Sequence, residues 1–346
     1  MTGLRIAVLG TGANGASIGA DLVNAGLDVT FIEQWPAHVE AMRSRGLRVE
    51  MPGAVETTSD LTVLHLCEVA TLRRPFDLVL VVVKAYDTRW SCELIKPLVA
   101  PDGLVVGVQN GMTLDTIADV VGPERTLGAV IEISSNMFVP GVVDRQSPRE
   151  RSWFALGGID PAAHERADAV AAVLAHAGTV EVSEDIRASK WMKLVVNAAE
   201  LVPSALLDLA LADAVAVPGM REFMVQAGRE ALRTAIALGV APRPIFGMAG
   251  ARTEDPDRYV EQLFDAVLTD FTLPETRTTV LQDWMKNRRS EVEEINGLVV
   301  REQARLGGTA PANEATVRLA RLIEAGDRAP GVDNVGELLD AVAPRP

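Results

Sequence analysis

The chain is poor in the residues that build metal centres and covalent cross-links. Among its 346 residues there are two cysteines, Cys67 and Cys92, and four histidines. Because no Cys-x-x-Cys pair or Cys/His cluster occurs, we expect neither a disulfide framework nor a metal site. The histidines are scattered along the chain and indicate no catalytic triad.

A long apolar run is also missing. The longest, residues 78–83, is far shorter than the roughly 20 residues that a helix needs to cross a bilayer. The apolar stretch 4–10 leads into glycines and lacks both the longer apolar core and the cleavage signal of a secretory peptide. We therefore predict a cytoplasmic protein with no membrane partner.

Positive charge is scarce, since 33 lysines and arginines face 47 acidic residues and the formal net charge is −14. A nucleic-acid backbone would be repelled by this mean field, so we expect no nucleic-acid partner, although a local basic pocket could still hold a small anion. Hydrophobic residues make up 48% of the chain, which is ample for a core, and the length favours two domains.

The first half of the chain alternates between strand-like and helix-like segments. Residues 5–10 indicate a buried strand, 15–25 a helix that stops at Gly26, and 28–33 a second strand, which together open a βαβ unit. The alternation continues with strands expected at 77–83, 104–108 and 128–133 and helices at 92–99 and 114–121. This pattern favours a parallel sheet covered by helices.

After Val182 the pattern becomes almost entirely helical, and we place the domain boundary near residues 183–187. Ser290 with Glu293 three residues later predicts a capping box, Gly307 a helix end, and Asn313 a further N-cap. The helices are expected at 186–201, 220–238, 257–269, 290–306 and 314–325.

A glycine fingerprint follows the first strand. Residues 10–15 read Gly-Thr-Gly-Ala-Asn-Gly and match Gly-x-Gly-x-x-Gly between a strand and a helix. Gly10 permits the tight turn, Gly12 lets a pyrophosphate approach, and Gly15 lets the helix pack closely on the sheet. With Ala13 and Asn14, these residues would offer backbone N–H groups to phosphates at the positive end of the helix dipole. A glycine turn that holds no ligand is the alternative.

The acid that ends the second strand bears on the choice of cofactor. Glu33 follows Gly15 by eighteen residues, close to the offset of about 20 residues at which an acid contacts ribose hydroxyls. Its carboxylate would repel a 2′-phosphate, and the next residue is Gln34 rather than an arginine, so NAD(H) is favoured over NADP(H). The alternative is a solvated surface glutamate. The fold predicted from these patterns is a Rossmann-type doubly wound α/β domain, residues 1–185, followed by an all-α domain, 186–346.

Nearly the whole chain resembles the ketopantoate reductase family. The segments that carry the likeness, in order, are Gly10–Gly15, Val83–Ala85, Gln109–Gly111, Lys190–Asn197, Leu281–Asp283, Ser290–Glu291 and Ile295–Gly297. The resemblance implies a Rossmann domain, a helical domain that carries catalytic and dimerisation surfaces, a cleft between the two, and a homodimer.

Five positions match residues to which the family gives a role. By this resemblance Lys193 is the catalytic lysine, Asn197 helps to hold the substrate, and Glu291 contacts substrate or cofactor hydroxyls. Lys84 and Asn110 match residues that line the cofactor site.

Three positions depart from the family pattern. Gln34 replaces an arginine that many members use to hold the 2′-phosphate, and Thr279 replaces a substrate-contacting serine while keeping the hydroxyl. Leu201 stands where the pantoate-forming enzymes have a second asparagine, beside Glu200, for which we expect no counterpart. The change at Leu201 puts ketopantoate itself in doubt as the substrate.

On a helix Lys193, Asn197 and Glu200 share one face, because they are spaced at i, i+4 and i+7. Lys193 could act as general acid toward a developing alkoxide, and Asn197 could orient the carbonyl. Glu200 could bind a substrate hydroxyl or ammonium or tune Lys193, whereas the simpler alternative is a surface ion pair. Lys190, on the same face, competes for the role of acid. Glu291 could simply be an acid in the first turn of a helix.

The sequence thus predicts a nicotinamide-dependent oxidoreductase that interconverts a carbonyl and an alcohol, acting on a small 2-oxo acid or a related hydroxy-carbonyl compound. Two alternatives stay open. One is a dehydrogenase that oxidises a larger alcohol, and the other is a protein that senses NAD(H) without turnover.

Overall fold

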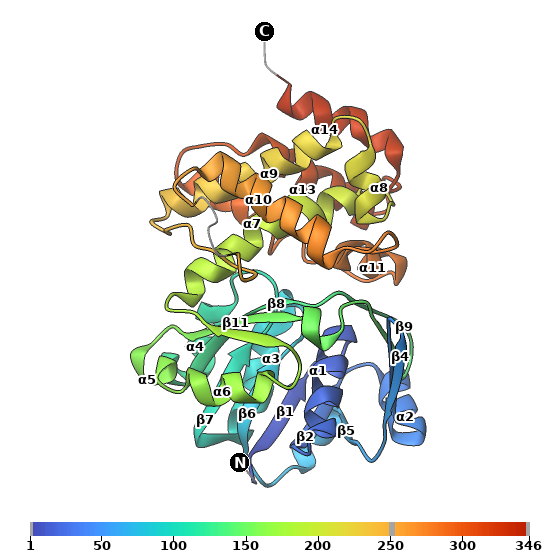
Figure 1. The fold of residues 1–346 in the computed structure, drawn as a ribbon, viewed down its shortest axis with the longest axis vertical. Coiled ribbons are helices and arrows are strands. Elements are labelled where there is room, and N and C mark those ends of the chain that lie inside the picture. Colours follow the sequence, from blue (N-terminus) through green and yellow to red (C-terminus); the bar gives the residue numbers. More distant parts are fainter. Residues whose placement is uncertain (1–2, 249–252, 344–346) are drawn as a thin grey trace. The chain divides into compact units, whose positions relative to one another are not determined.

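The computed structural model describes residues 3–248 and 253–343. Its contacts divide the chain into two units, residues 1–187 and 188–346; the first is α/β and the second is helical (Figure 1). The predicted fold class, a Rossmann-type sheet followed by an all-α region, is confirmed. No helix among the described residues combines the length and the apolar composition that crossing a bilayer requires.

An eight-stranded sheet forms the centre of the first unit. Its spatial order is β12 (Thr179–Val182), β11 (Trp153–Gly158), β8 (Thr126–Glu132), β7 (Val99–Gly107), β6 (Phe76–Val81), β1 (Arg5–Leu9), β2 (Asp28–Glu33) and β5 (Thr62–His65). The six strands from β8 to β5 run parallel, as the alternating pattern predicts. The prediction of a parallel sheet is wrong at one edge, because β11 is antiparallel to β8.

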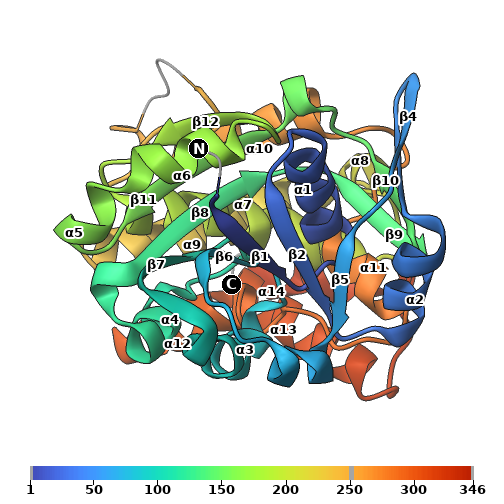
Figure 2. The same cartoon turned by 90° about the horizontal axis from the view of Figure 1, so that it is seen from below.

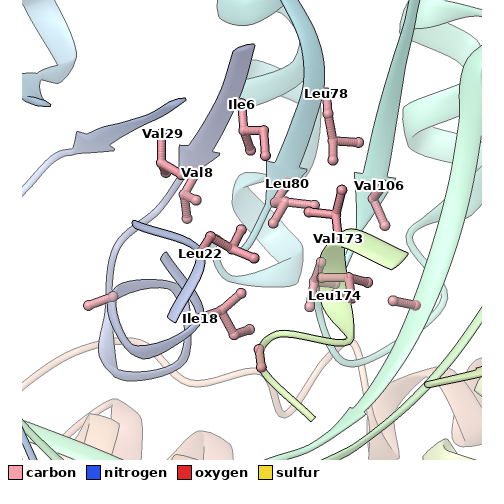
Figure 3. Close-up of a cluster of buried hydrophobic side chains, with 14 of the residues drawn as sticks. Ile6, Val8, Ile18, Leu22, Val29, Leu78, Leu80, Val106, Val173 and Leu174 are labelled. Carbon is pink, nitrogen blue, oxygen red and sulfur yellow. The ribbon is translucent and has the colours of Figure 1, made fainter. Parts of the chain in front are cut away.

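Helices cover both faces of this sheet (Figure 2). The helices of the unit are α1 (Ala13–Asn24), α2 (Pro36–Arg45), α3 (Thr88–Ile95), α4 (Leu114–Val121), α5 (Pro161–His164) and α6 (Ala167–Leu174). Because alternate strand residues point to opposite faces, Ile6 and Val8 pack toward α1 and α6, where Ile18 and Val173 meet them (Figure 3). Ala7 and Leu9 instead join the core beneath α3 and α4.

A second, four-stranded sheet lies outside the sequence prediction. Its order is β4 (Ala54–Thr58), β3 (Leu47–Met51), β10 (Val142–Arg145) and β9 (Ser135–Val139). The strands have four or five residues each, and β3 pairs with β10 from about ninety residues further along the chain. Arg145 ties this sheet to α1, because its guanidinium donates to Asp21 and both side chains are buried.

Helices make up the second region among the described residues, and the longest helices of the chain are among them. They are α7 (Ile186–Ala205), α8 (Leu211–Ala216), α9 (Met220–Ala237), α10 (Pro256–Ala266) with a π-helical continuation at Val267–Phe271, α11 (Thr279–Met285), α12 (Asn296–Arg305), α13 (Pro311–Glu324) and α14 (Val335–Val342). From residue 188 to 207 every residue of α7 and its C-terminal extension is buried. A helix that is buried on all sides can keep charged side chains only where these are paired or hydrogen-bonded.

Two predicted helix starts are wrong. The capping box at Ser290 does not form, because α12 begins only at Asn296. The Ser290 hydroxyl and backbone N–H both donate to Glu324, while Glu293 accepts from Arg321. Asn313 is not an N-cap either; it lies inside the first turn of α13.

Candidate active site

The glycine turn has the shape that a dinucleotide requires. Gly10 has a φ of +90°, and a Cβ there would lie 2.7 Å from the backbone nitrogen of Val83. A Cβ on Gly15 would lie 2.1 Å from the carbonyl oxygen of Gly10. A Cβ on Gly12, by contrast, would meet nothing within 4 Å, and no side chain caps the N-terminus of α1. The open space at Gly12 and the uncapped start of α1, at Ala13 and Asn14, fit a pyrophosphate.

Two side chains brace this turn at Thr11. One carboxylate oxygen of Glu33 accepts hydrogen bonds from the Thr11 backbone N–H, at 2.7 Å, and from its hydroxyl, at 3.0 Å. The other accepts from the backbone N–H of Trp35. Burial lowers the pKa of His38, so the imidazole is neutral at pH 7; it accepts from the Gly141 N–H and donates to the Thr11 carbonyl.

Glu33 is thus no solvated surface glutamate. It is 6% exposed, and this alternative is wrong. Glu33 could be predicted because it is an acid at the end of β2, but its hydrogen bonds to Thr11 could not. His38 was not predicted to contact the turn, because a single histidine in a helical segment indicates no particular partner.

The remaining cofactor candidates lie at the same edge of the sheet. Leu9, Val81 and Gly107 are neighbours in the register of β1, β6 and β7, and all three strands are parallel. Lys84 and Asn110 follow the second and third of these strands by three residues each, so both come from the carboxyl edge that also carries the glycine turn. Ligands of open α/β sheets bind outside this edge.

The side chain of Asn14 is held by a residue that is distant in the sequence. Its side-chain oxygen accepts a hydrogen bond from the hydroxyl of Ser135 on β9, 121 residues away. The Asn14 carbonyl accepts from Ser17 within α1. The second sheet therefore helps to hold the N-terminal turn of α1, and no local pattern could have predicted Ser135.

In the second unit, α7 brings the predicted polar side chains together. Lys193, Asn197 and Glu200 are 8%, 1% and 4% exposed. The Lys193 ammonium lies 3.9 Å from a carboxylate oxygen of Glu200. A surface ion pair is therefore the wrong description, because both members of the pair are buried.

Lys190 and Glu291 are also buried, and their charges act on each other. Burial lowers the pKa of the Lys190 ammonium to about 8, and the Glu291 carboxylate acts in the opposite direction. The prediction that Glu291 lies in the first turn of a helix is wrong, because residues 291–295 form turns that precede α12. Its burial beside a lysine is a tertiary arrangement and not a helix-dipole effect.

Buried amides hold these turns against α7. The Asn296 side chain donates to the carbonyl of Ala198 on α7, at 2.9 Å, and to the side chain of Asn313, at 2.8 Å. Asn313 in turn donates to the Ala227 carbonyl and to Glu230. The Ile295–Gly297 segment therefore serves to dock the chain near Glu291 onto the helix of Lys193.

Thr279 is the first residue of α11, and its neighbour Thr278 is the N-cap. The Thr278 hydroxyl donates to the carbonyl of Leu201 and so fixes the start of α11 against α7. The hydroxyl oxygen of Thr279 is buried and has no hydrogen-bond partner among the described residues.

An aromatic residue that contacts Lys193 could not be predicted from the sequence. The ring of Phe246 lies over the Lys193 ammonium, with 5.3 Å between the nitrogen and the ring centroid. Phe246 also contacts Phe271, with 5.4 Å between ring centroids and 51° between ring planes. Phe246 belongs to the connection between α9 and α10, where no periodic pattern marks it.

These features define the class of protein. A glycine turn at the carboxyl edge of a parallel sheet, and a helix with a buried ammonium, belong to an oxidoreductase that interconverts a carbonyl and an alcohol with a nicotinamide cofactor. Residues 6–157 match the family model described as ketopantoate reductase PanE/ApbA, and residues 185–324 match the model of its C-terminal part. The chain belongs to the ketopantoate reductase family, as the resemblance predicts.

Individual relatives agree with this assignment. A 2-dehydropantoate 2-reductase from Caulobacter vibrioides is 30% identical, over 91% of this chain and 97% of the relative. A ketopantoate reductase of the PanE/ApbA family from Ralstonia eutropha has a similar structure, with a TM-score of 0.77, 28% identity and coverage of 93% and 99%. A D-mandelate dehydrogenase solved with NADH and anilino(oxo)acetate shares the fold, with a TM-score of 0.82, 20% identity and the same coverage.

Proposed function

We propose that this enzyme reduces a small 2-oxo acid and that Lys193 is its general acid. The observation that carries the proposal is the buried Lys193 ammonium on the same helix face as Asn197 and Glu200. The curated relatives are 2-dehydropantoate 2-reductases, which supports a 2-oxo acid as the substrate class. Neither an oxidative role on a larger alcohol nor sensing without turnover is favoured by this membership.

Each residue of the helical unit has a separate task in the proposal. The nicotinamide, when bound, supplies the hydride. Lys193 stabilises the negative charge that develops on the carbonyl oxygen and gives it a proton. Glu200, at 3.9 Å, favours the charged form of Lys193 and so keeps a proton ready.

Three further residues hold the substrate or the cofactor in this proposal. Asn197 orients the carbonyl, and the buried hydroxyl of Thr279 donates to the substrate carboxylate. Glu291 contacts a hydroxyl of the substrate or cofactor, with Lys190 beside it to balance its charge.

For the cofactor we propose NAD(H). Glu33 ends β2 where the ribose is expected, and a buried carboxylate there disfavours a 2′-phosphate. Its oxygen that accepts from Trp35 can accept one more hydrogen bond, from a ribose hydroxyl. Gly10, Gly12, Ala13, Asn14 and Gly15 hold the pyrophosphate, and Lys84 and Asn110 line the site, in a protein that we expect to be a cytoplasmic homodimer.

The test is the Lys193→Ala variant. We expect kcat for the best 2-oxo acid to fall by about 10²–10⁴, the usual share of a positioned acid, while the dissociation constant of the reduced cofactor stays within about threefold. Lys96→Ala, at an exposed lysine of the first unit, is the matched control and should change neither value. Turnover near the wild-type rate in Lys193→Ala would remove this residue from the mechanism.

A further inference from the structure

Phe246 occupies a backbone conformation that large side chains avoid. The Met248 N–H donates to the Ile245 carbonyl at 3.1 Å, and the two residues between them have φ values of +60° for Phe246 and +67° for Gly247. This is the pattern of a type I′ turn, whose first central position favours Asn, Asp or Gly. A phenylalanine there is strained, and such strain persists where the surrounding structure holds it and function benefits.

The surrounding structure does hold the turn. Ile245 is buried, and the hydroxyl of Tyr259, itself buried in α10, donates to the carbonyl of Arg243. The segment that presents Phe246 is therefore fixed at points one and three residues before it. Phe271, the ring that Phe246 contacts, ends a π-helical segment, a local irregularity that is frequent at functional sites.

The two rings place an apolar surface next to the proton donor. Phe246 covers the ammonium of Lys193, and Phe271 extends the surface from Phe246. Leu201, eight residues after Lys193 on α7, adds no hydrogen-bonding side chain. A substrate whose carbonyl meets Lys193 would therefore have aromatic carbon beside the atoms attached to that carbonyl.

We propose that Phe246 and Phe271 form an aromatic wall that selects the substrate side chain, so that the enzyme prefers 2-oxo acids with a bulky apolar group over those with a hydroxyl group at that place. This inference rests on the proposed function and refines its substrate class. The wall cannot accept or donate a hydrogen bond, so a substrate hydroxyl placed against it loses its hydration without replacement.

The experiment compares two substrates of nearly equal shape. Ketopantoate carries a terminal hydroxyl, and 3,3-dimethyl-2-oxopentanoate carries a methyl group in its place; pyruvate, with a single methyl group beside its carbonyl, is the small reference substrate. We expect the wild type to have a kcat/KM roughly tenfold higher for the methyl compound than for ketopantoate, within the range by which apolar pockets discriminate. In Phe246→Asn we expect this ratio to fall to about threefold or less, beyond any change in kcat/KM that is common to all three substrates.

Asparagine is chosen because it tolerates positive φ and so keeps the turn while removing the ring. Thermal unfolding should show Phe246→Asn to be at least as stable as the wild type. Leu306→Asn, which makes the same kind of change at an exposed apolar residue after α12, is the matched control and should leave the ratio unchanged.

The outcomes separate the two proposals. An active wild type whose substrate ratio is unchanged in Phe246→Asn overturns the wall alone. An equal loss on all three substrates also overturns it, because Phe246 would then position Lys193 and select nothing. A wild type that reduces none of the three with either cofactor overturns the proposed function, and the wall with it.

Discussion

Alanine substitutions at Gly12 and Gly15 should separate binding of the cofactor from folding of the turn. Both glycines belong to the same fingerprint, but their surroundings differ. At Gly12 an added Cβ meets no atom within 4 Å, and the backbone, with φ −62° and ψ −165°, suits alanine. At Gly15 the added Cβ would lie 2.1 Å from the Gly10 carbonyl oxygen and 3.3 Å from Val82.

The expected magnitudes follow from these contacts. Gly12→Ala should change the free energy of unfolding by less than about 1 kcal/mol, because a weaker N-cap and a less flexible unfolded chain act in opposite directions. The new methyl group, however, occupies the space through which a pyrophosphate reaches the helix N–H groups. Loss of one such charged hydrogen bond, about 1.5–3 kcal/mol, would weaken binding of the reduced cofactor by roughly 10- to 100-fold.

Gly15→Ala should lower both the free energy of unfolding and the affinity for the reduced cofactor. The Gly10 carbonyl must move by about 1 Å to admit the methyl group, and overpacking of this kind typically costs about 1–3 kcal/mol of stability. Gly336→Ala is the control, because a Cβ at this position of α14 also meets nothing within 4 Å. It should raise stability by up to about 1 kcal/mol and leave cofactor binding unchanged.

Fluorescence titration with NADH and NADPH, together with urea unfolding, measures both quantities on each variant. A Gly12→Ala protein that is stable and binds the cofactor with wild-type affinity would refute the assignment of this turn as the pyrophosphate site.

Two further predictions concern the buried polar groups of the helical unit. Asn296→Ala should lower the free energy of unfolding by about 2–4 kcal/mol in urea, because it removes the buried donor that joins the Ala198 carbonyl to the Asn313 side chain; Asn136→Ala, at a half-buried asparagine whose hydrogen bond to Asp144 is at the surface, should change it by less than about 0.5 kcal/mol. Since burial lowers the pKa of Lys190 from 10.5 to about 8, the unfolded chain binds more protons than the folded one between these values. Wild-type stability, measured against Lys190→Met, should therefore rise from pH 8 to about 10.5 and stay level below pH 8. A flat difference across that range would contradict a buried lysine with a lowered pKa.

The parts of the fold that local pattern specifies could be predicted from the sequence. The strand–glycine–helix opening has apolar residues, turn glycines and an acid within thirty-five positions, and β2 and α4 have the predicted bounds. The spacing of Lys193, Asn197 and Glu200 likewise follows from helix geometry alone.

What could not be predicted depends on partners distant in sequence. The short strands of the second sheet are stable only because β3 meets β10, and the Ser290 capping box is lost because Glu324 offers a better acceptor. Burial of the Lys193–Glu200 pair, and the ring of Phe246 over it, also arise from packing of separate helices and a loop. Periodicity carries no information about such encounters.

The bonds of Glu33 have a consequence for attempts to alter cofactor choice. The carboxylate that would repel a 2′-phosphate is the same group that accepts two hydrogen bonds from Thr11 and one from Trp35. Exchanging it for a neutral or basic side chain is the obvious route to an NADP-dependent variant. This exchange would also remove the acceptor for Thr11 and leave its buried backbone N–H without a hydrogen bond. A successful redesign must therefore supply a replacement acceptor for Thr11 together with the new phosphate ligand.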